Sequence, residues 1–231
     1  MKIKILSDTH TFHLDEPQDK VDLLIHCGDA TNYRAEFANE KEWWYFWEWW
    51  TGYPAEYKVY VPGNHDGFLD SSPGRKFIKE VNKNSSISGL FILVNTTVEI
   101  EGIKIFGSPY TPTFGNWSFM RARSTIHKNW THIEEGTDIV ITHGPPKGVL
   151  DLAPTWGRSA GGVELCGDNS LLKAIKKIKP KYHFFGHIHD NTAGDNNGIV
   201  IRNGITFINC SQVVDGQFNK GLQHKGKIIE L

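Results

Sequence analysis

The sequence predicts a mixed α/β protein, because short apolar runs with strand character alternate along the chain with segments of helical periodicity. Five of the predicted strands end in Asp, Asn or His side chains, at the point where the strand passes into a loop. In open α/β sheets, ligands gather at the carboxyl ends of the strands, so these side chains can meet although they are distant in sequence. One pattern therefore predicts both the fold class and the candidate site.

The composition points away from proteins that bind long nucleic acids. The 231 residues contain 25 Lys and Arg against 26 Asp and Glu, with a formal net charge of -1. A protein that grips extended nucleic acid through its phosphates favours a basic surface, so such a partner is not expected. Small phosphate-bearing substrates are compatible with this net charge, because a bound metal can neutralise the charge of the phosphate. No Pro-, Gly- or Ser-rich linker divides the chain, which predicts a single domain over residues 1–231.

The cysteines and the N-terminal residues predict a cytoplasmic protein. Cys27, Cys166 and Cys210 are far apart, odd in number and without CxxC spacing, which is typical of a reduced compartment. The chain turns polar at Ser7-Asp8, too early for the apolar region of a signal peptide. No apolar run approaches the length of a membrane span, so no membrane partner is expected.

Three strands are predicted in the N-terminal part of the chain, over residues 2–6, 23–27 and 57–61. The second is apolar enough to be buried on both faces. Polar residues able to bind a metal or move a proton follow each strand: Asp8 and His10, then Asp29, then Asn64 and His65.

Residues 34–50 contain no Pro or Gly and predict a helix that Gly52 and Pro54 end. Five of the eight tryptophans lie between Trp43 and Trp50, and they spread beyond one helical stripe. One interpretation is that one side packs on the sheet and the excess covers neighbouring loops. The other is a stacking wall or a partner surface, including a contact between copies of the chain.

The middle of the chain predicts a helix over residues 73–81 and an antiparallel meander of short strands over 90–94, 98–100 and 103–106. Residues 107–129 lose periodicity and predict a long loop with interleaved aromatic and polar residues. Long loops are often functional, so Asn116 and Trp117 are candidate substrate contacts. The alternative is a packed surface loop whose aromatic residues serve the core.

Two further strands precede histidines: residues 138–142 end at His143, and residues 182–185 end at Gly186-His187-Ile188-His189. Between them, Asp168 or Asn169 caps a helix that Pro180 stops. A hairpin around Asn203-Gly204 and a final strand near residues 228–229 complete the predicted elements.

The candidate ligands are too numerous for one metal ion with an open position, and they suit two ions. Oxygen and imidazole ligands without thiolate favour Mn, Fe, Zn, Ni or Co. Two cations about 3.5–4 Å apart need a bridging carboxylate, and Asp29 suits this role because it arrives alone on its strand. A water between the ions would be acidified toward hydroxide and could attack phosphorus. The seven candidates are Asp8, His10, Asp29, Asn64, His143, His187 and His189.

These motifs resemble the five signatures of calcineurin-like metallophosphoesterases. The matching segments are Asp8-x-His10, Gly28-Asp29, Gly63-Asn64-His65-Asp66, Thr142-His143-Gly144 and Gly186-His187-Ile188-His189. Within the superfamily, Ser7-Asp8-Thr9-His10, His26-Cys27-Gly28-Asp29 and His143-Gly144-Pro145-Pro146-Lys147-Gly148 look like the metallophosphoesterase-domain-containing branch, whose members hydrolyse cyclic nucleotide phosphodiesters.

The resemblance implies two packed mixed β-sheets flanked by helices, with a dinuclear metal centre. It assigns one ion to Asp8, His10, Asp29 and His189, and the other to Asp29, Asn64, His143 and His187. It makes His65 the catalytic imidazole that contacts phosphate and can protonate the leaving oxygen. Some animal members of the branch have Gly in place of the first His of the last motif. His187 is present here, which implies a complete centre.

One departure from a sister group narrows the function. Protein serine/threonine phosphatases carry an Asp that orients the catalytic imidazole, where this chain has Asn32. This disfavours a protein phosphatase and favours small phosphodiesters with good leaving groups. Asp66 is the alternative residue for orienting His65, although adjacent side chains usually diverge.

The leading hypothesis is a hydrolase that uses two divalent ions, Mn favoured, to cleave 2',3'- or 3',5'-cyclic nucleotides. A nuclease or phosphomonoesterase with the same centre is the alternative enzyme. A nucleotide-binding or scaffold protein with little activity is the alternative from another class.

Overall fold

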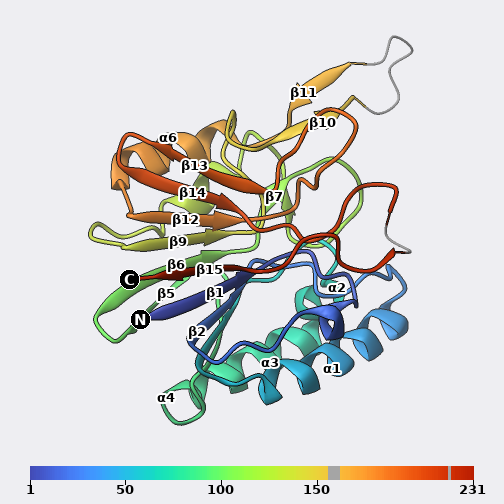
Figure 1. Cartoon of the computed structure of the whole chain (residues 1–231), viewed down its shortest axis with the longest axis vertical. Coiled ribbons are helices and arrows are strands. Elements are labelled where there is room, and N and C mark those ends of the chain that lie inside the picture. Colours follow the sequence, from blue (N-terminus) through green and yellow to red (C-terminus); the bar gives the residue numbers. More distant parts are fainter. Residues whose placement is uncertain (156–161, 218–219) are drawn as a thin grey trace.

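The computed structural model describes residues 1–155, 162–217 and 220–231. Two mixed sheets pack face to face, and helices cover the outer face of each sheet (Figure 1). This arrangement confirms the predicted α/β fold of two packed mixed sheets flanked by helices.

The first sheet has the strand order β15-β1-β2-β3-β4. Its strands β1 to β4 are parallel, whereas β15 pairs antiparallel with β1. The strands span Lys2–Leu6 (β1), Val21–His26 (β2), Ala55–Tyr60 (β3), Leu90–Ile92 (β4) and Lys227–Glu230 (β15).

The second sheet has the order β13-β14-β12-β9-β6-β5. Its four central strands are parallel, and the edge strands β5 and β13 pair antiparallel with their neighbours. The strands span Thr96–Ile100 (β5), Ile103–Ser108 (β6), Ile139–Thr142 (β9), Tyr182–Phe185 (β12), Gly198–Arg202 (β13) and Ile205–Asn209 (β14).

Alternation along the central strands explains why they are apolar on both faces. Ile139 and Ile141 of β9 lie in the core between the sheets, whereas Val140 faces the outer helices. In β12, Phe184 likewise lies between the sheets, and Phe185 faces the outer helices. Strands buried on both faces have nearly continuous apolar sequences, which is the pattern seen here.

Helices α1 (Glu36–Gly52), α2 (Gly67–Asp70) and α3 (Ser72–Lys83) pack on the first sheet. Helices α5 (His127–Trp130) and α6 (Asn169–Ile178) pack on the second. The N-cap of α6 is Asp168, whose carboxylate accepts from the main-chain N–H groups of Ser170 and Leu171. A turn of 3-10 helix (His13–Asp15) and the short helix α4 (Ser85–Ser88) complete the helices of the described ranges.

Most of the aromatic side chains of helix α1 pack on the sheet, as the first of the two interpretations predicts. Trp43, Phe46, Trp49 and Trp50 are buried, and Trp47 is half-buried. The outer side still carries exposed rings, those of Phe37, Trp44 and Tyr45. A partner on that side stays a prediction.

The expected antiparallel meander over residues 90–106 is wrong in its first strand. β4 leaves the meander and extends the first sheet, where it pairs parallel with β3. Only β5 and β6 form the antiparallel hairpin. Local spacing predicted strands at these positions, but the partner of β4 is set by the α2–α3 crossover that precedes it.

The structure also adds short elements that the sequence pattern did not indicate. Strands β7 (Thr111–Pro112) and β8 (Met120–Arg121) pair within the long loop. Strands β10 (Leu152–Pro154) and β11 (Val163–Leu165) pair antiparallel. By contrast, the hairpin of β13 and β14 and the final strand β15 were expected and are confirmed.

Candidate metal centre

The strand register aligns the carboxyl ends of the parallel strands at one edge of the molecule. Leu6, His26 and Tyr60 are register partners across β1, β2 and β3. A parallel bridge between Ser7 and Ser211 joins the first sheet to the second at this edge. Loops that leave the two sheets here therefore share one space.

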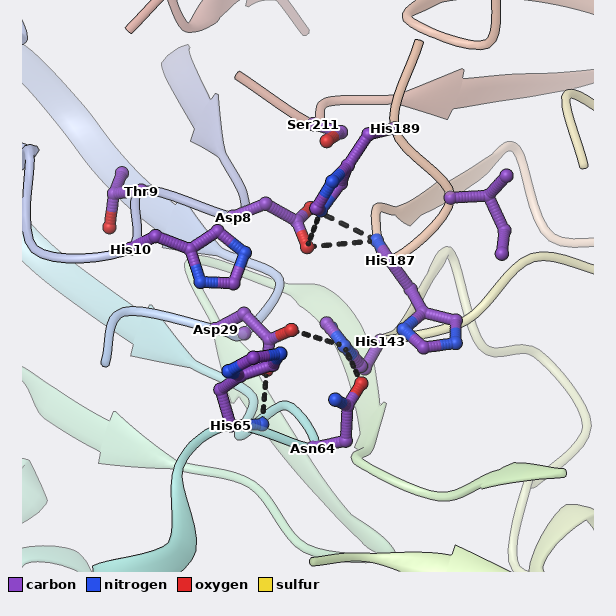
Figure 2. A network of polar contacts seen from close by, with 12 residues as sticks. Asp8, Thr9, His10, Asp29, Asn64, His65, His143, His187, His189 and Ser211 are labelled. Atoms are coloured by element: carbon purple, nitrogen blue, oxygen red, sulfur yellow. Dashed lines mark hydrogen bonds and ion pairs between the residues drawn. The ribbon is translucent and has the colours of Figure 1, made fainter. Parts of the chain in front are cut away.

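The candidate ligands of both sheets come together in this space (Figure 2). Potential ligand atoms lie within 4.8 Å of one another in three overlapping groups. Asn64 joins the second group, since its Oδ1 lies 3.0 Å from Nε2 of His143. The groups are Asp8, His10 and His189; Asp29, His143 and His187; and His10, Asp29 and His65.

The two carboxylates in the cluster are buried and contact imidazole nitrogens. Asp8 Oδ1 lies 3.3 Å from Nε2 of His189, and Asp29 Oδ2 lies 3.2 Å from Nε2 of His143. Burial opposes the charge on His143, but Asp29 outweighs it and raises the imidazole pKa to about 9. Burial is likewise outweighed at His189, by hydrogen bonds to Asp215 and Asp8, and its pKa rises to about 10. The buried carboxylates thus require positive charge beside them.

Backbone strain is concentrated at the candidate ligands. Asp8, His10, Asp29 and His187 have φ values of 55°, 42°, 59° and 69°, in the left-handed region that non-glycine residues seldom adopt. Such conformations cost free energy and persist where the surrounding structure enforces them, typically at functional sites. Here they turn the side chains inward within a few residues of the strand ends.

Glycines in the motifs allow two of these loops to reach the carboxylates. A Cβ on Gly63 would stand 2.1 Å from Oδ1 of Asp29, and one on Gly186 would stand 2.1 Å from Oδ2 of Asp8. Any larger residue at either position would displace a candidate ligand.

Three imidazoles are oriented by hydrogen-bond partners outside the cluster. Nδ1 of His10 lies 3.2 Å from the Thr31 carbonyl, and Nδ1 of His143 lies 2.8 Å from the Cys27 carbonyl. Nδ1 of His189 lies 2.8 Å from the Asp215 carboxylate. Such contacts fix the ring and the tautomer, leaving Nε2 for the centre. Asp215 was missed by sequence reasoning, because it lies in a loop without any recognisable motif.

The imidazole of His65 is oriented by a main-chain group. Its Nδ1 lies 3.0 Å from the carbonyl oxygen of Asn32, and its main-chain N–H donates to Oδ1 of Asp29 at 2.7 Å. The alternative that Asp66 orients His65 is wrong. The Asp66 carboxylate instead accepts from the main-chain N–H groups of Asp29 (2.9 Å) and Gly63 (2.6 Å). It thereby ties the loops after β2 and β3 together.

A cavity of about 480 Å³ opens beside the cluster. Asp29, Asn64, His65, His187 and His189 form its polar floor. Other lining residues include Phe114, Trp117, Arg123, Pro145 and Pro154. Trp117 thus lines the cavity, and its contact with a substrate stays a prediction. Asn116 is exposed and does not line this cavity, so its contact with a substrate stays a prediction.

The donor set fits divalent cations. Carboxylate, amide and imidazole groups converge, and divalent ions would take over the positive charge that protonated His143 and His189 supply beside the carboxylates. Thiols play no part in these groups.

Comparison with known proteins agrees with this chemistry. The family model described as calcineurin-like phosphoesterase matches residues 1–191. The chain belongs to the calcineurin-like phosphoesterase family. Its members are metal-dependent, and the candidate ligands of this one are among the residues drawn in Figure 2.

Curated relatives place this calcineurin-like phosphoesterase near one branch. It is similar to metallophosphoesterase domain-containing protein 1 of Homo sapiens, with 32% identity over 223 residues that cover 89% of this chain and 64% of the relative. The chain thus spans less than two thirds of the length of that human protein. UPF0046 protein K07C11.7 of Caenorhabditis elegans is 32% identical over 232 residues, covering 96% of this chain and 72% of the relative.

Solved structures share the fold of this phosphoesterase at low sequence identity. The protein TT1561 of Thermus thermophilus has a TM-score of 0.60 and 11% identity, covering 91% of this chain and 90% of its own. Another solved structure has a TM-score of 0.64 and 14% identity, covering 99% and 98%. Separately, no helix of the described ranges has both the length and the apolar character needed to cross a bilayer.

Proposed function

We propose that this phosphoesterase hydrolyses small phosphodiesters, specifically 2',3'- or 3',5'-cyclic nucleotides, with two divalent metal ions, Mn favoured. The observation that carries the proposal is the position of the cavity, which is lined by members of all three ligand groups and has an aromatic wall. Its volume of about 480 Å³ lies within the roughly 300–1,000 Å³ typical of small-molecule sites. A pocket of this kind suits a single nucleotide better than an extended strand.

The ligand sets of the proposal divide the cluster between its two sides. Asp8, His10, Asp29 and His189 would hold one ion, and Asp29, Asn64, His143 and His187 the other. When bound, the ions would supply a hydroxide nucleophile at neutral pH and neutralise charge on the phosphoryl oxygens. Asp29 shares one ligand group with His10 of the first set and another with His143 and His187 of the second, which supports its role as the shared carboxylate.

His65 is proposed to donate a proton to the leaving oxygen. The Asn32 carbonyl can only accept a hydrogen bond, so Nδ1 of His65 carries a hydrogen. The transferable proton is therefore the one on Nε2 of the imidazolium. A cyclic nucleotide releases a ribose oxygen, which departs as an alkoxide unless it is protonated, so its departure benefits from this proton.

The nucleotide base is proposed to lie against Phe114. This side chain is 59% exposed and lines the cavity, and its ring centroid lies 5.3 Å from that of His187. An exposed aromatic face beside the centre can stack on any base. Trp117 is less suitable, because the Arg34 guanidinium lies over its indole at 3.5 Å from the ring centroid.

The direct test measures turnover by the purified protein reconstituted with Mn²⁺. The substrates are 2',3'- and 3',5'-cyclic AMP, a linear dinucleotide and AMP, with a chelator-treated sample as the control. We expect metal-dependent opening of a cyclic diester and little release of phosphate from AMP. Faster cleavage of the dinucleotide or of AMP would favour the nuclease or the phosphomonoesterase. Nucleotide binding without cleavage would favour the binding protein.

Two variants separate metal binding from proton transfer. His65→Ala should keep both metals and lose about 10²- to 10⁴-fold in rate on the cyclic substrate. Asn64→Ala should lose metal occupancy, measured by elemental analysis of the protein. Equal metal loss in the two variants would contradict this division of roles.

A further inference from the structure

One short loop after β2 approaches the His65 imidazole from two directions. Its Asn32 carbonyl lies 3.0 Å from Nδ1 of His65. Two residues further on, Arg34 places its guanidinium carbon 3.5 Å from the centroid of the Trp117 ring. Trp117 in turn packs on His65, with ring centroids 4.2 Å apart and planes inclined by 37°. The catalytic candidate is thus enclosed by the loop and by the indole that the loop holds.

The loop is anchored to helix α1. The Glu42 carboxylate accepts from the main-chain N–H groups of Asn32 (2.7 Å) and Tyr33 (2.9 Å). Nδ2 of Asn39 donates to the carbonyls of Tyr33 and His65, both at 2.6 Å. Helix α1 therefore anchors both the loop that holds the imidazole and the backbone of His65 itself.

Trp117 occupies an unusual position for a loop tryptophan. It is half-buried, it lines the cavity, and it contacts an ionisable ring on one side and a cation on another. A guanidinium over an indole is attracted by the ring quadrupole, and this attraction orders two otherwise mobile side chains. Arg34 itself is exposed, so its contact with Trp117 is not imposed by core packing.

We propose that Trp117, held by Arg34, is a positioning residue for His65. The indole blocks rotation of the imidazole away from the Asn32 carbonyl and keeps the opposite ring nitrogen directed at the centre, near His10 and Asp29. This inference rests on the proposed function, because positioning matters only if His65 delivers a proton during diester cleavage.

Leaving-group dependence distinguishes positioning from a general structural role. The ribose oxygen of 2',3'-cyclic AMP needs a proton to depart, whereas nitrophenolate from bis(4-nitrophenyl) phosphate departs without one. Damage to the fold or to the metal centre slows both substrates alike. Misplacement of the proton donor slows only the cyclic substrate.

The experiment compares kcat for the two substrates in Mn²⁺-loaded variants with equal metal content. Trp117→Ala should lose about 10- to 100-fold on 2',3'-cyclic AMP, the scale of a misplaced catalytic group. It should lose no more than about threefold on bis(4-nitrophenyl) phosphate. Trp117→Phe, which keeps an aromatic ring, should recover most of the rate. Arg34→Ala should show the same selectivity with a smaller loss.

Phe114→Ala is the matched control, because Phe114 lies in the same loop and lines the same cavity but contacts His187. It should raise KM for the nucleotide and leave the ratio of kcat values for the two substrates unchanged. The double variant His65→Ala/Trp117→Ala should be no slower than His65→Ala alone, since the two residues act as one unit. Equal losses on both substrates, or additive losses in the double variant, would overturn the proposal.

A crystal structure of Trp117→Ala provides a readout that is independent of turnover. We expect the His65 ring to be displaced from the Asn32 carbonyl in Trp117→Ala and retained in Trp117→Phe. An undisturbed ring in Trp117→Ala refutes the positioning role even if the enzyme is active. If the wild type cleaves neither diester, the proposed function fails, while the position of the ring still decides this inference.

Discussion

At the scale of single residues, the candidate site depends on groups that hold the ligands as well as on the ligands themselves. Asp215 is the clearest example, because its carboxylate lies 2.8 Å from Nδ1 of His189 while Nε2 of the same ring faces Asp8. A carboxylate in this position fixes the ring and makes the imidazole a stronger ligand.

Replacing Asp215 should therefore weaken metal binding without removing a ligand. We expect Asp215→Asn to lower the affinity for Mn²⁺ about 10- to 100-fold, measured by calorimetric titration of the metal-free protein. Asp195→Asn, the same charge change at an exposed position of the same half of the chain, is the control and should bind Mn²⁺ as the wild type does. Equal affinities of the two variants for Mn²⁺ would show that Asp215 does not support the metal centre.

His13 is a buried histidine that the proposed chemistry does not use. It is fully buried against the rings of Tyr45, Phe46 and Trp49, and neither ring nitrogen has a hydrogen-bond partner within the described chain. Burial lowers the pKa of the imidazole from 6.5 to about 4. The unfolded chain therefore binds a proton at His13 more readily than the folded chain does. As a result, the free energy of unfolding falls as the pH drops from about 6.5 towards about 4.

The His13→Leu variant should be more stable than the wild type, particularly in acid. At pH 7 we expect a gain of about 1 kcal/mol in the free energy of unfolding, because an unpaired polar group leaves the core. At pH 5 the advantage should grow by about 2 kcal/mol, since the protonation penalty of His13 disappears. Urea unfolding of the metal-free proteins at both pH values measures this. A constant difference between the two pH values would contradict the account.

At the scale of elements, α1 serves both as the cover of the first sheet and as the anchor of the loop that holds His65. Its buried face packs on β1, β2 and β3, and Glu42 and Asn39 bind the loop from the same helix. The exposed rings of Phe37, Trp44 and Tyr45 lie outside these roles.

Two tryptophans of α1 separate the packing role from a partner surface. Trp43 is fully buried, so Trp43→Ala should lower the free energy of unfolding by about 3–5 kcal/mol, measured in urea. Trp44 is 43% exposed, and Trp44→Ala should cost about 1 kcal/mol or less. If the outer side of α1 joins copies of the chain, Trp44→Ala should also shift the elution volume in size-exclusion chromatography. Unchanged elution would exclude Trp44 from such an interface.

At the scale of the whole molecule, the candidate centre joins the two sheets. Asp8, Asp29 and Asn64 follow strands of the first sheet, whereas His143 and His187 follow strands of the second. Metal held by side chains from both sheets would act as a clamp that exists only in the folded protein. Metal binding is therefore coupled to the stability of the whole fold.

Removing the metals should lower the melting temperature. With Mn²⁺ at about 100 times its Kd, binding adds about 3 kcal/mol, so a chelator should reduce Tm by roughly 5–10 °C in a protein of this size. Differential scanning calorimetry with and without chelator measures the shift. Asp29→Ala should lose most of this response, and an equal shift in that variant would show that the stabilising ions bind elsewhere.

The sequence by itself determined the α/β class, most strands and every residue that now meets in the cluster. These features are readable because strand periodicity and side-chain chemistry are local, and parallel strands present their carboxyl ends at a common edge. From Asp8 to His189, each candidate ligand lies within a few residues of its strand.

Only the tertiary structure decided how these residues are held. The Asn32 carbonyl orients His65. Because every residue has a main-chain oxygen, the residue type at this position does not reveal the contact. Asp215 reaches His189 from a loop without a motif, and Arg34 covers Trp117 across a long sequence separation. The pairing of β4 with β3 in the first sheet was likewise decided by tertiary packing. Such pairings depend on which distant segments packing brings together, and local spacing carries no information about that choice.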